Sequence, residues 1–236
     1  MEQKLLYLDD SYIKEFDATA ISVKDGKYIV MDQTAFYPQG GGQPHDTGIV
    51  IDSSGNKYRV VYVGKFDGVV SIEVDKPGLK EGERLHCIID WERRYKLMRY
   101  HTAAHVLSAV FSKESGALIT GNQLNIEKSR FDFNIAEFNR DLMGEYVEKA
   151  NKIISEGRRV RIYYLPRDEV EKQGLTKLAK GLPKGLELLR IVEIENFDIQ
   201  ADGGTHVKNT AEIGRIEVLK YENKGKNNRR IYFRIS

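Results

Sequence analysis

The sequence predicts an α+β protein, in which a small N-terminal β-barrel precedes helices packed on an antiparallel sheet. Two observations lead to this prediction. The first half is a series of short β-branched and aromatic runs separated by turn residues, an arrangement typical of small barrels. The second half alternates helical periodicity with strand-like runs. The junction is expected near Ile88 to Asp90, which gives predicted domains at 1–88 and 89–236.

The N-terminal half is expected to supply the barrel strands. Turn-forming strings such as Lys24 to Lys27 and Ser53 to Asn56 separate them. The predicted strands are Ala18 to Lys24, Tyr28 to Met31, Gly48 to Asp52, Tyr58 to Gly64, Val69 to Val74 and Arg84 to Ile89.

A glycine-rich segment, Tyr37 to Pro44, lies between two of these strands. Its glycines expose backbone N–H groups that can line a substrate cleft, which makes Gly41 and Gly42 candidate site residues. The segment lacks the GK[ST] string of a P-loop. A tight connection between strands is the alternative interpretation.

One long helix is predicted from Trp91 to Phe111, because apolar residues fill it and neither proline nor glycine interrupts it. Residues four apart share a helix face, so His101 and His105 can direct two imidazoles at one divalent ion. Two satisfied core histidines are the alternative. Thr102 occupies the position where a zincin protease carries its catalytic glutamate, so the HExxH pattern is absent.

Further elements follow the long helix. Apolar spacing predicts a helix from Asp141 to Glu156, which Gly157 ends. Strands are predicted at Arg158 to Tyr164 and Leu188 to Ile194, and the chain finishes in a hairpin with a basic turn around Asn223 to Asn228. Candidates for RNA phosphate contacts, or for a solubilising hairpin tip, are Lys224, Lys226, Arg229 and Arg230.

A second pair of candidate ligands, Asp202 and His206, has the same spacing as the histidine pair. Gly203 and Gly204 predict a loop there, before a strand from Ile213 to Leu219. Three imidazoles and one carboxylate match the tetrahedral donor set of zinc, with bonds of ~2.0–2.2 Å. The sequence therefore predicts one Zn²⁺ per chain, bound by His101, His105, Asp202 and His206. In the alternative, Asp202 only caps its turn and His206 bonds a neighbour.

Composition narrows the class of protein. The apolar runs are far shorter than the roughly 20 residues that a spanning helix needs, and the first residues lack the core of a signal peptide. We expect a cytoplasmic protein without a membrane partner. The single cysteine, Cys87, is predicted to be a buried strand residue rather than a nucleophile.

Charge is divided unevenly along the chain. Residues 1–90 contain 10 Lys and Arg against 15 Asp and Glu, whereas residues 91–236 contain 27 against 20. Because nucleic-acid affinity depends largely on phosphate neutralisation, the basic second half favours an anionic partner such as RNA. An ordinary solvated surface is the alternative.

Four strings of the chain form one distinctive set: TAFYPQGGGQPHDTG (34–48), DWERRYKLMRYHTAAHVLSAVF (90–111), KSRFDFN (128–134) and ADGGTHVKNTAEIG (201–214). Together they resemble the editing domain of alanyl-tRNA synthetases and its free-standing relatives, the AlaX proteins, over nearly the whole chain. The glycine-rich N-terminal region makes the chain similar to the medium-length AlaX proteins.

The resemblance implies an ATP-independent hydrolase that serves translation fidelity. Its expected substrate is tRNA(Ala) mischarged with serine, with the glycine ester as a further candidate, and it would spare Ala-tRNA(Ala) and bind no DNA. Thr120 resembles the family's serine-sensing threonine, although a turn threonine is the alternative. Lys128 and Arg130 are candidates for contacts with the tRNA end, or for solvent-facing charges, and the same segment brings Gln123, Asp132 and Asn134 near the expected cleft.

The chain departs from the family at Asp202, where the family motif usually has cysteine. A carboxylate is a harder ligand than a thiolate, so zinc is expected to bind less tightly and to exchange more easily. Two other functions therefore stay open: a metal-stabilised tRNA-binding module without hydrolysis, and a metallo-hydrolase of another ester.

Overall fold

The computed structural model describes residues 3–136, 139–176, 182 and 185–236. The chain divides into two compact units, Met1–Leu97 and Met98–Ser236, and the division falls within helix α2 (Trp91–Ser115). The domain limits 1–88 and 89–236 stay a prediction, because compactness alone does not define a domain.

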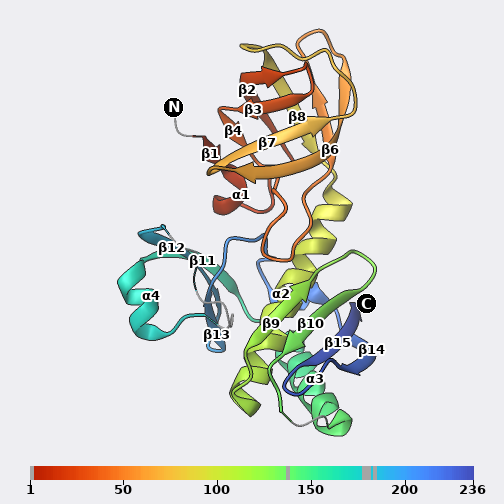
Figure 1. Ribbon diagram of the computed structural model, residues 1–236, viewed down its shortest axis with the longest axis vertical. Coiled ribbons are helices and arrows are strands. Elements are labelled where there is room, and N and C mark those ends of the chain that lie inside the picture. The colour runs from red at the N-terminus through yellow and green to blue at the C-terminus, as the bar shows by residue number, and fades with distance from the viewer. Residues whose placement is uncertain (1–2, 137–138, 177–181, 183–184) are drawn as a thin grey trace. The chain divides into compact units, whose positions relative to one another are not determined.

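Unit 1 is built on a closed antiparallel barrel, which confirms the predicted barrel (Figure 1). Side chains alternate between the interior and the surface, so that Val70, Ile72 and Val74 of one strand are buried. In barrel order the strands are β2 (Glu15–Lys24), β3 (Tyr28–Met31), β7 (Val69–Val74), β6 (Lys57–Phe66), β5 (Gly48–Ile51) and β8 (Arg84–Ile89).

Small elements complete unit 1. The short strands β1 (Lys4–Leu5) and β4 (Gln33–Thr34) pair in parallel, and α1 (Leu6–Asp9) follows β1 directly. Cys87 lies buried in β8, as predicted, and burial raises the pKa of its thiol.

The glycine-rich segment forms a tight turn in unit 1. Gly40 and Gln43 exchange two backbone hydrogen bonds, at 3.1 and 2.8 Å. Gly41 and Gly42 between them have φ angles of 58° and 87°, which favour glycine. The amide of Gln39 donates to Val63 O at 3.0 Å and attaches the turn to β6.

A buried ion pair joins the start of α2 to the barrel. Arg94 donates from Nε to Asp46 Oδ1 at 2.9 Å, and neither side chain is accessible to solvent. Arg94 also donates to Ser11 O and Ala35 O, while Asp46 accepts from Tyr37 N at 2.6 Å. A single arginine therefore ties three loop segments of unit 1 to the helix.

Unit 2 contains two antiparallel sheets, and with its helices it confirms the α+β class (Figure 1). The four-stranded sheet has the order β14 (Ile216–Asn223), β15 (Arg229–Ile235), β10 (Ser129–Phe133) and β9 (Ile119–Gln123). The three-stranded sheet has the order β11 (Val160–Pro166), β12 (Leu188–Ile194) and β13 (Asp198–Ala201). The other helices are α3 (Arg140–Ser155), α4 (Arg167–Gln173) and the 3₁₀ helix η1 (Thr210–Ile213).

The strand predicted from Ile213 to Leu219 is wrong at its start. Ile213 ends η1, whose first turn is closed by a capping box between Asn209 and Glu212, and β14 begins only at Ile216. The predicted C-terminal hairpin is formed by β14 and β15.

Helix α2 is the core element of unit 2. Its residues from Met98 to Val110 are buried on nearly every side, as expected for a helix that is apolar all round. Phe111 stacks on Phe133 of β10 with ring centroids 4.5 Å apart. This packing fixes the rotation of the helix, and with it the direction of its two histidines.

Candidate metal centre

Two elements of unit 2 supply the candidate ligands. His101 and His105 extend from one face of α2, while Asp202 and His206 lie in the loop between β13 and η1. The loop is attached to the neighbouring strand β12, because Asp202 N donates to Arg190 O at 3.0 Å and Arg190 Nη1 donates to Asp202 O at 2.9 Å.

Gly204 allows the loop to pass directly over an imidazole. A Cβ atom at this position would lie 2.2 Å from Cε1 of His101, a distance that no side chain tolerates. The amide of Gly204 donates to Asp202 Oδ1 at 2.6 Å and orients the carboxylate. Neighbouring Gly203 has open space around its position, so the two glycines have different roles.

The four candidate ligand atoms lie within 4.8 Å of one another. Asp202 Oδ2 is 3.5 Å from His101 Nε2 and 3.7 Å from His105 Nε2, and Asp202 Oδ1 is 3.7 Å from His206 Nε2. Ligand atoms around tetrahedral zinc are separated by about 3.3 Å, given bonds of ~2.0–2.1 Å. The spacing of the cluster therefore fits a zinc-sized cation.

The positions of the histidine nitrogen atoms are consistent with binding of a cation. His206 Nδ1 lies 3.1 Å from Gly204 O, so an N–H there leaves a lone pair on Nε2 facing the cluster. His105 Nε2 lies 3.2 Å from His206 Nε2. Among the residues that the structure describes, the buried Nδ1 of His105 has no hydrogen-bond partner.

Electrostatics favour the protonation states that bind metals. Burial alone would raise the pKa of Asp202, but the imidazoles around it, His101 first, hold that pKa well below its ordinary value. Burial lowers the pKa of His206, and the two neighbouring histidines lower it further. An ionised carboxylate and a neutral imidazole are the forms that donate lone pairs to a cation.

Thr102 connects the two ligand-bearing elements. Its hydroxyl donates to Met98 O at 3.0 Å within α2 and accepts from Val207 N at 3.1 Å, next to His206. Sequence reasoning used Thr102 only to exclude a zincin. Its tie to the loop depends on a contact across 105 residues, which no local pattern encodes.

The other predicted site residues lie outside this cluster. Thr120 is exposed on β9 and its Oγ1 donates to Asn228 Oδ1 at 3.2 Å. Gly41 and Gly42 belong to the turn of unit 1. Asn134 Oδ1 accepts from Leu118 N at 2.5 Å, a bond that fixes the chain beside β9. The catalytic roles of Thr120, Gly41 and Gly42 stay predictions.

The basic residues of the hairpin differ in exposure. Arg229 is buried and its guanidinium donates to Asn223 Oδ1 at 2.9 Å and to Asn228 O at 3.1 Å, so it stabilises the hairpin turn. The burial of Arg229 therefore argues against its candidate role in phosphate contacts. Arg230 points to the opposite face of the sheet, where it meets Asp132.

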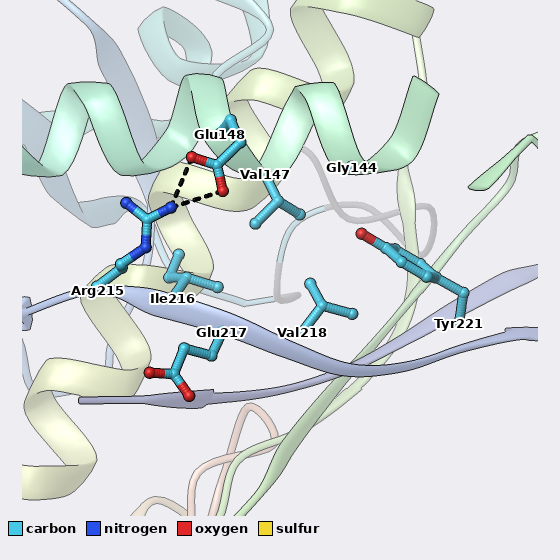
Figure 2. A pocket seen from close by; sticks show the side chains of 8 residues that line it. All are labelled: Gly144, Val147, Glu148, Arg215, Ile216, Glu217, Val218 and Tyr221. Atoms are coloured by element: carbon cyan, nitrogen blue, oxygen red, sulfur yellow. Dashed lines mark hydrogen bonds and ion pairs between the residues drawn. The ribbon is translucent and has the colours of Figure 1, made fainter. Parts of the chain in front are cut away.

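A separate open pocket of about 380 Å³ lies between α3 and β14 and contains none of the predicted site residues (Figure 2). Val147 of α3 lines one side of the pocket, and Val218 and Tyr221 of β14 line the other (Figure 2). Arg215 and Glu148, which form an ion pair, also line it. In the described part of the chain, no helix has the length and apolar character needed to span a membrane.

Two family models match the chain. Residues 189–232 match the threonyl and alanyl tRNA synthetase second additional domain, a segment that includes both loop ligands. Residues 4–93 match the class II (A) tRNA synthetases, and this segment covers the barrel.

Individual relatives match over nearly the full chain. The chain is 50% identical over 239 residues to the alanyl-tRNA editing protein AlaX-M of Methanosarcina acetivorans, which covers 98% of each protein. It is 44% identical over 233 residues to AlaX-M of Saccharolobus solfataricus, again 98% of each. An alanine–tRNA ligase of Pyrococcus furiosus is 40% identical over 226 residues, which are 94% of this chain and 24% of the ligase.

Proposed function

This chain belongs to the AlaX-M family of alanyl-tRNA editing proteins, and we propose that it hydrolyses the ester that joins a wrong amino acid to tRNA(Ala). The proposed substrate is Ser-tRNA(Ala), with the glycine ester as a second substrate, while Ala-tRNA(Ala) is spared. The observation that carries the proposal is the cluster of three histidines and one aspartate in a chain that matches these relatives over 98% of its length.

We assign Zn²⁺ to the cluster, with His101, His105, Asp202 and His206 as ligands, one ion per chain. When bound, the ion would polarise the ester carbonyl, activate a water molecule or orient the substrate's amine and hydroxyl. The residues supply a preorganised set of lone pairs, because Gly204 N fixes Asp202 and the carbonyl of Gly204 fixes His206. An aminoacyl ester is intrinsically labile, so positioning of the ester and the attacking water can be sufficient for its hydrolysis.

Discrimination against alanine requires a group that senses the serine hydroxyl. We assign this role to Thr120, because a site that hydrogen-bonds a substrate hydroxyl can reject the analogue that lacks it. The Thr120 hydroxyl donates to Asn228 and keeps its lone pairs for a substrate O–H. Separately, the backbone N–H groups of Gly41 and Gly42 in unit 1 are proposed to contact the substrate.

The direct test is the rate of deacylation of Ser-tRNA(Ala), compared with Ala-tRNA(Ala) and with a His101→Ala, His105→Ala variant. We expect rapid release of serine and little release of alanine by the wild-type protein, and no serine release above the spontaneous rate by the variant. Release no faster than spontaneous hydrolysis would contradict the proposal, and tRNA binding without release would then identify a non-catalytic module.

Thr120 is tested separately by substitution. Thr120→Val removes the hydroxyl and should reduce the preference for the seryl over the alanyl ester, whereas Thr120→Ser should retain it. An unchanged preference in the valine variant would show that another group senses serine.

A further inference from the structure

The outer face of the four-stranded sheet carries a group of polar side chains that the metal centre does not use. On β10 and β15, Phe131 and Phe233 are buried on the side that packs against α2. The alternate residues point to the opposite side. Arg130 pairs with Tyr232 and Asp132 with Arg230 in the strand register, so these four side chains are neighbours on that side.

Asp132 holds two guanidinium groups at once. Arg230 binds it in a bidentate manner, from Nε to Oδ1 at 2.6 Å and from Nη2 to Oδ2 at 2.8 Å. Arg130 adds a bond from Nη1 to Oδ2 at 3.1 Å. On the adjacent strand β9, a Cβ at Gly121 would lie 3.1 Å from Asp132 Oδ2, so a glycine leaves room for the carboxylate. The two arginines are thereby held in fixed orientations.

This arrangement leaves positive charge uncompensated. One carboxylate balances only one of the two arginines, and Lys128 adds a third cation, with Nζ 5.2 Å from the centre of the Tyr232 ring. The neighbouring strand β14 places Glu222 opposite Arg230, and Glu222 meets Lys220 at 2.7 Å and Lys224 at 3.9 Å. The cations around this face therefore still outnumber its carboxylates, whereas Glu217 balances Arg234 one to one at 2.7 Å.

The two arginines also retain hydrogen-bond donors. An arginine has five N–H groups. The hydrogen bonds within the described residues use three groups of Arg230, two to Asp132 and one to Tyr232 Oη, and two groups of Arg130, one to Asp132 and one to Gln123. The remaining donors are partly accessible, because the side chains of Arg130 and Arg230 are 28% and 17% exposed.

We propose that this face, formed by Lys128, Arg130, Arg230 and Tyr232 around Asp132, binds the phosphate backbone of RNA. Guanidinium groups in a fixed orientation match the geometry of phosphate oxygens, and the mixture of cations with an aromatic ring suits a nucleic acid better than a small anion. The identification of this RNA as tRNA(Ala) rests on the proposed function.

The test uses uncharged RNA, so that binding is measured without catalysis. The probe is a fluorescein-labelled hairpin with the acceptor stem of tRNA(Ala) and its single-stranded CCA end, titrated by fluorescence anisotropy at several KCl concentrations. Arg130→Gln with Arg230→Gln should weaken binding at least tenfold. Because each phosphate contact contributes about 0.7–0.9 to the salt slope, that slope should fall by about one to two.

Two control variants distinguish the loss of an RNA contact from a general effect of removing charge or stability. Arg234→Gln removes a cation of the same sheet that Glu217 neutralises, and it should change the affinity less than twofold. Because loss of both arginines leaves Asp132 buried without a partner, the triple variant that adds Asp132→Asn removes this strain and should bind RNA as weakly as the double variant. Circular dichroism checks that each variant is folded.

Unchanged affinity and salt slope in the folded triple variant would overturn the inference. That outcome is distinct from failure of the proposed function, which is measured by serine release from charged tRNA. If the protein binds the hairpin through this face but releases no serine, only the proposed function is overturned. If the wild-type protein releases serine and the triple variant binds the hairpin with the wild-type salt slope, only the inferred RNA-binding face is overturned.

Discussion

At Gly204, the absence of a side chain allows the loop to approach His101 closely in the proposed metal site. Gly204→Ala should displace His101 and lower zinc affinity at least tenfold, because the added methyl group overlaps the imidazole. Competition with a chelating dye measures the affinity. Gly203→Ala is the matched control, since open space surrounds that position. Equal affinities for the two variants would contradict this account of the loop.

If the cluster binds a metal as proposed, Asp202 should set its preference among metals. A thiolate is a softer ligand than a carboxylate, so Asp202→Cys should increase zinc retention during dialysis against a chelator. Asp202→Asn, which removes the negative charge, should decrease it. Metal content after dialysis should therefore follow the order Cys, Asp, Asn. Equal retention in all three proteins would show that only the histidines bind the ion.

The turn between β5 and β6 depends on the ionised form of Asp52. The side-chain amide of Asn56, followed by backbone amides and the Tyr58 hydroxyl, lowers the pKa of Asp52 against the effect of burial. Because the pKa of Asp52 is lower in the folded than in the unfolded chain, its ionised carboxylate stabilises the fold above about pH 3.9. This stabilisation is lost as the pH falls through the pKa of Asp52 in the folded chain. Asp52→Asn should therefore flatten the fall in stability between about pH 4 and pH 2, as measured by urea unfolding. An unchanged acid profile would count against this role.

At the scale of elements, the start of α2 depends on Arg94. Arg94→Met leaves Asp46 buried without its cation, which should reduce the free energy of unfolding of unit 1 by about 3–5 kcal/mol. The single tryptophan, Trp91, lies at the start of the same helix and reports this unfolding by fluorescence. Lys96→Met is the control, because Lys96 is exposed, and it should change stability by less than about 0.5 kcal/mol. A small effect at Arg94 would show that the pair fixes geometry without stabilising the fold.

At the scale of the whole molecule, metal binding should stabilise the folded chain. A ligand at 100 times its Kd adds about 2.7 kcal/mol to the folded state, which corresponds to an increase of about 5–10 °C in Tm for a unit of this size. Calorimetry with added Zn²⁺ should show this increase in the wild-type protein and not in the His101→Ala, His105→Ala variant. An equal response of both proteins would locate the bound metal elsewhere.

Local patterns determined the parts of this protein whose contacts lie close in sequence. Alternating side chains predicted the barrel strands, and an uninterrupted apolar helix with a four-residue spacing placed His101 and His105 on one face. The two glycines after Asp202 predicted the ligand loop. The equal spacing of the two pairs and their combined donor set then predicted that loop and helix share one site, and the structure brings these four residues together.

Tertiary structure alone decided the contacts between distant segments. Asp132 meets Arg230 across 98 residues, and Arg94 meets Asp46 across 48, although neither pair carries a periodic signal. The strand β9 was not predicted, because the polar segment Ile119 to Gln123 lacks the alternation of a strand and pairs with β10 only in the folded chain. Hydrogen bonds and charge pairs depend on the position of both partners, whereas burial leaves a local period in the sequence. For this reason the sequence determined the barrel strands, the long helix and the ligand types, and the folded chain decided which polar groups meet.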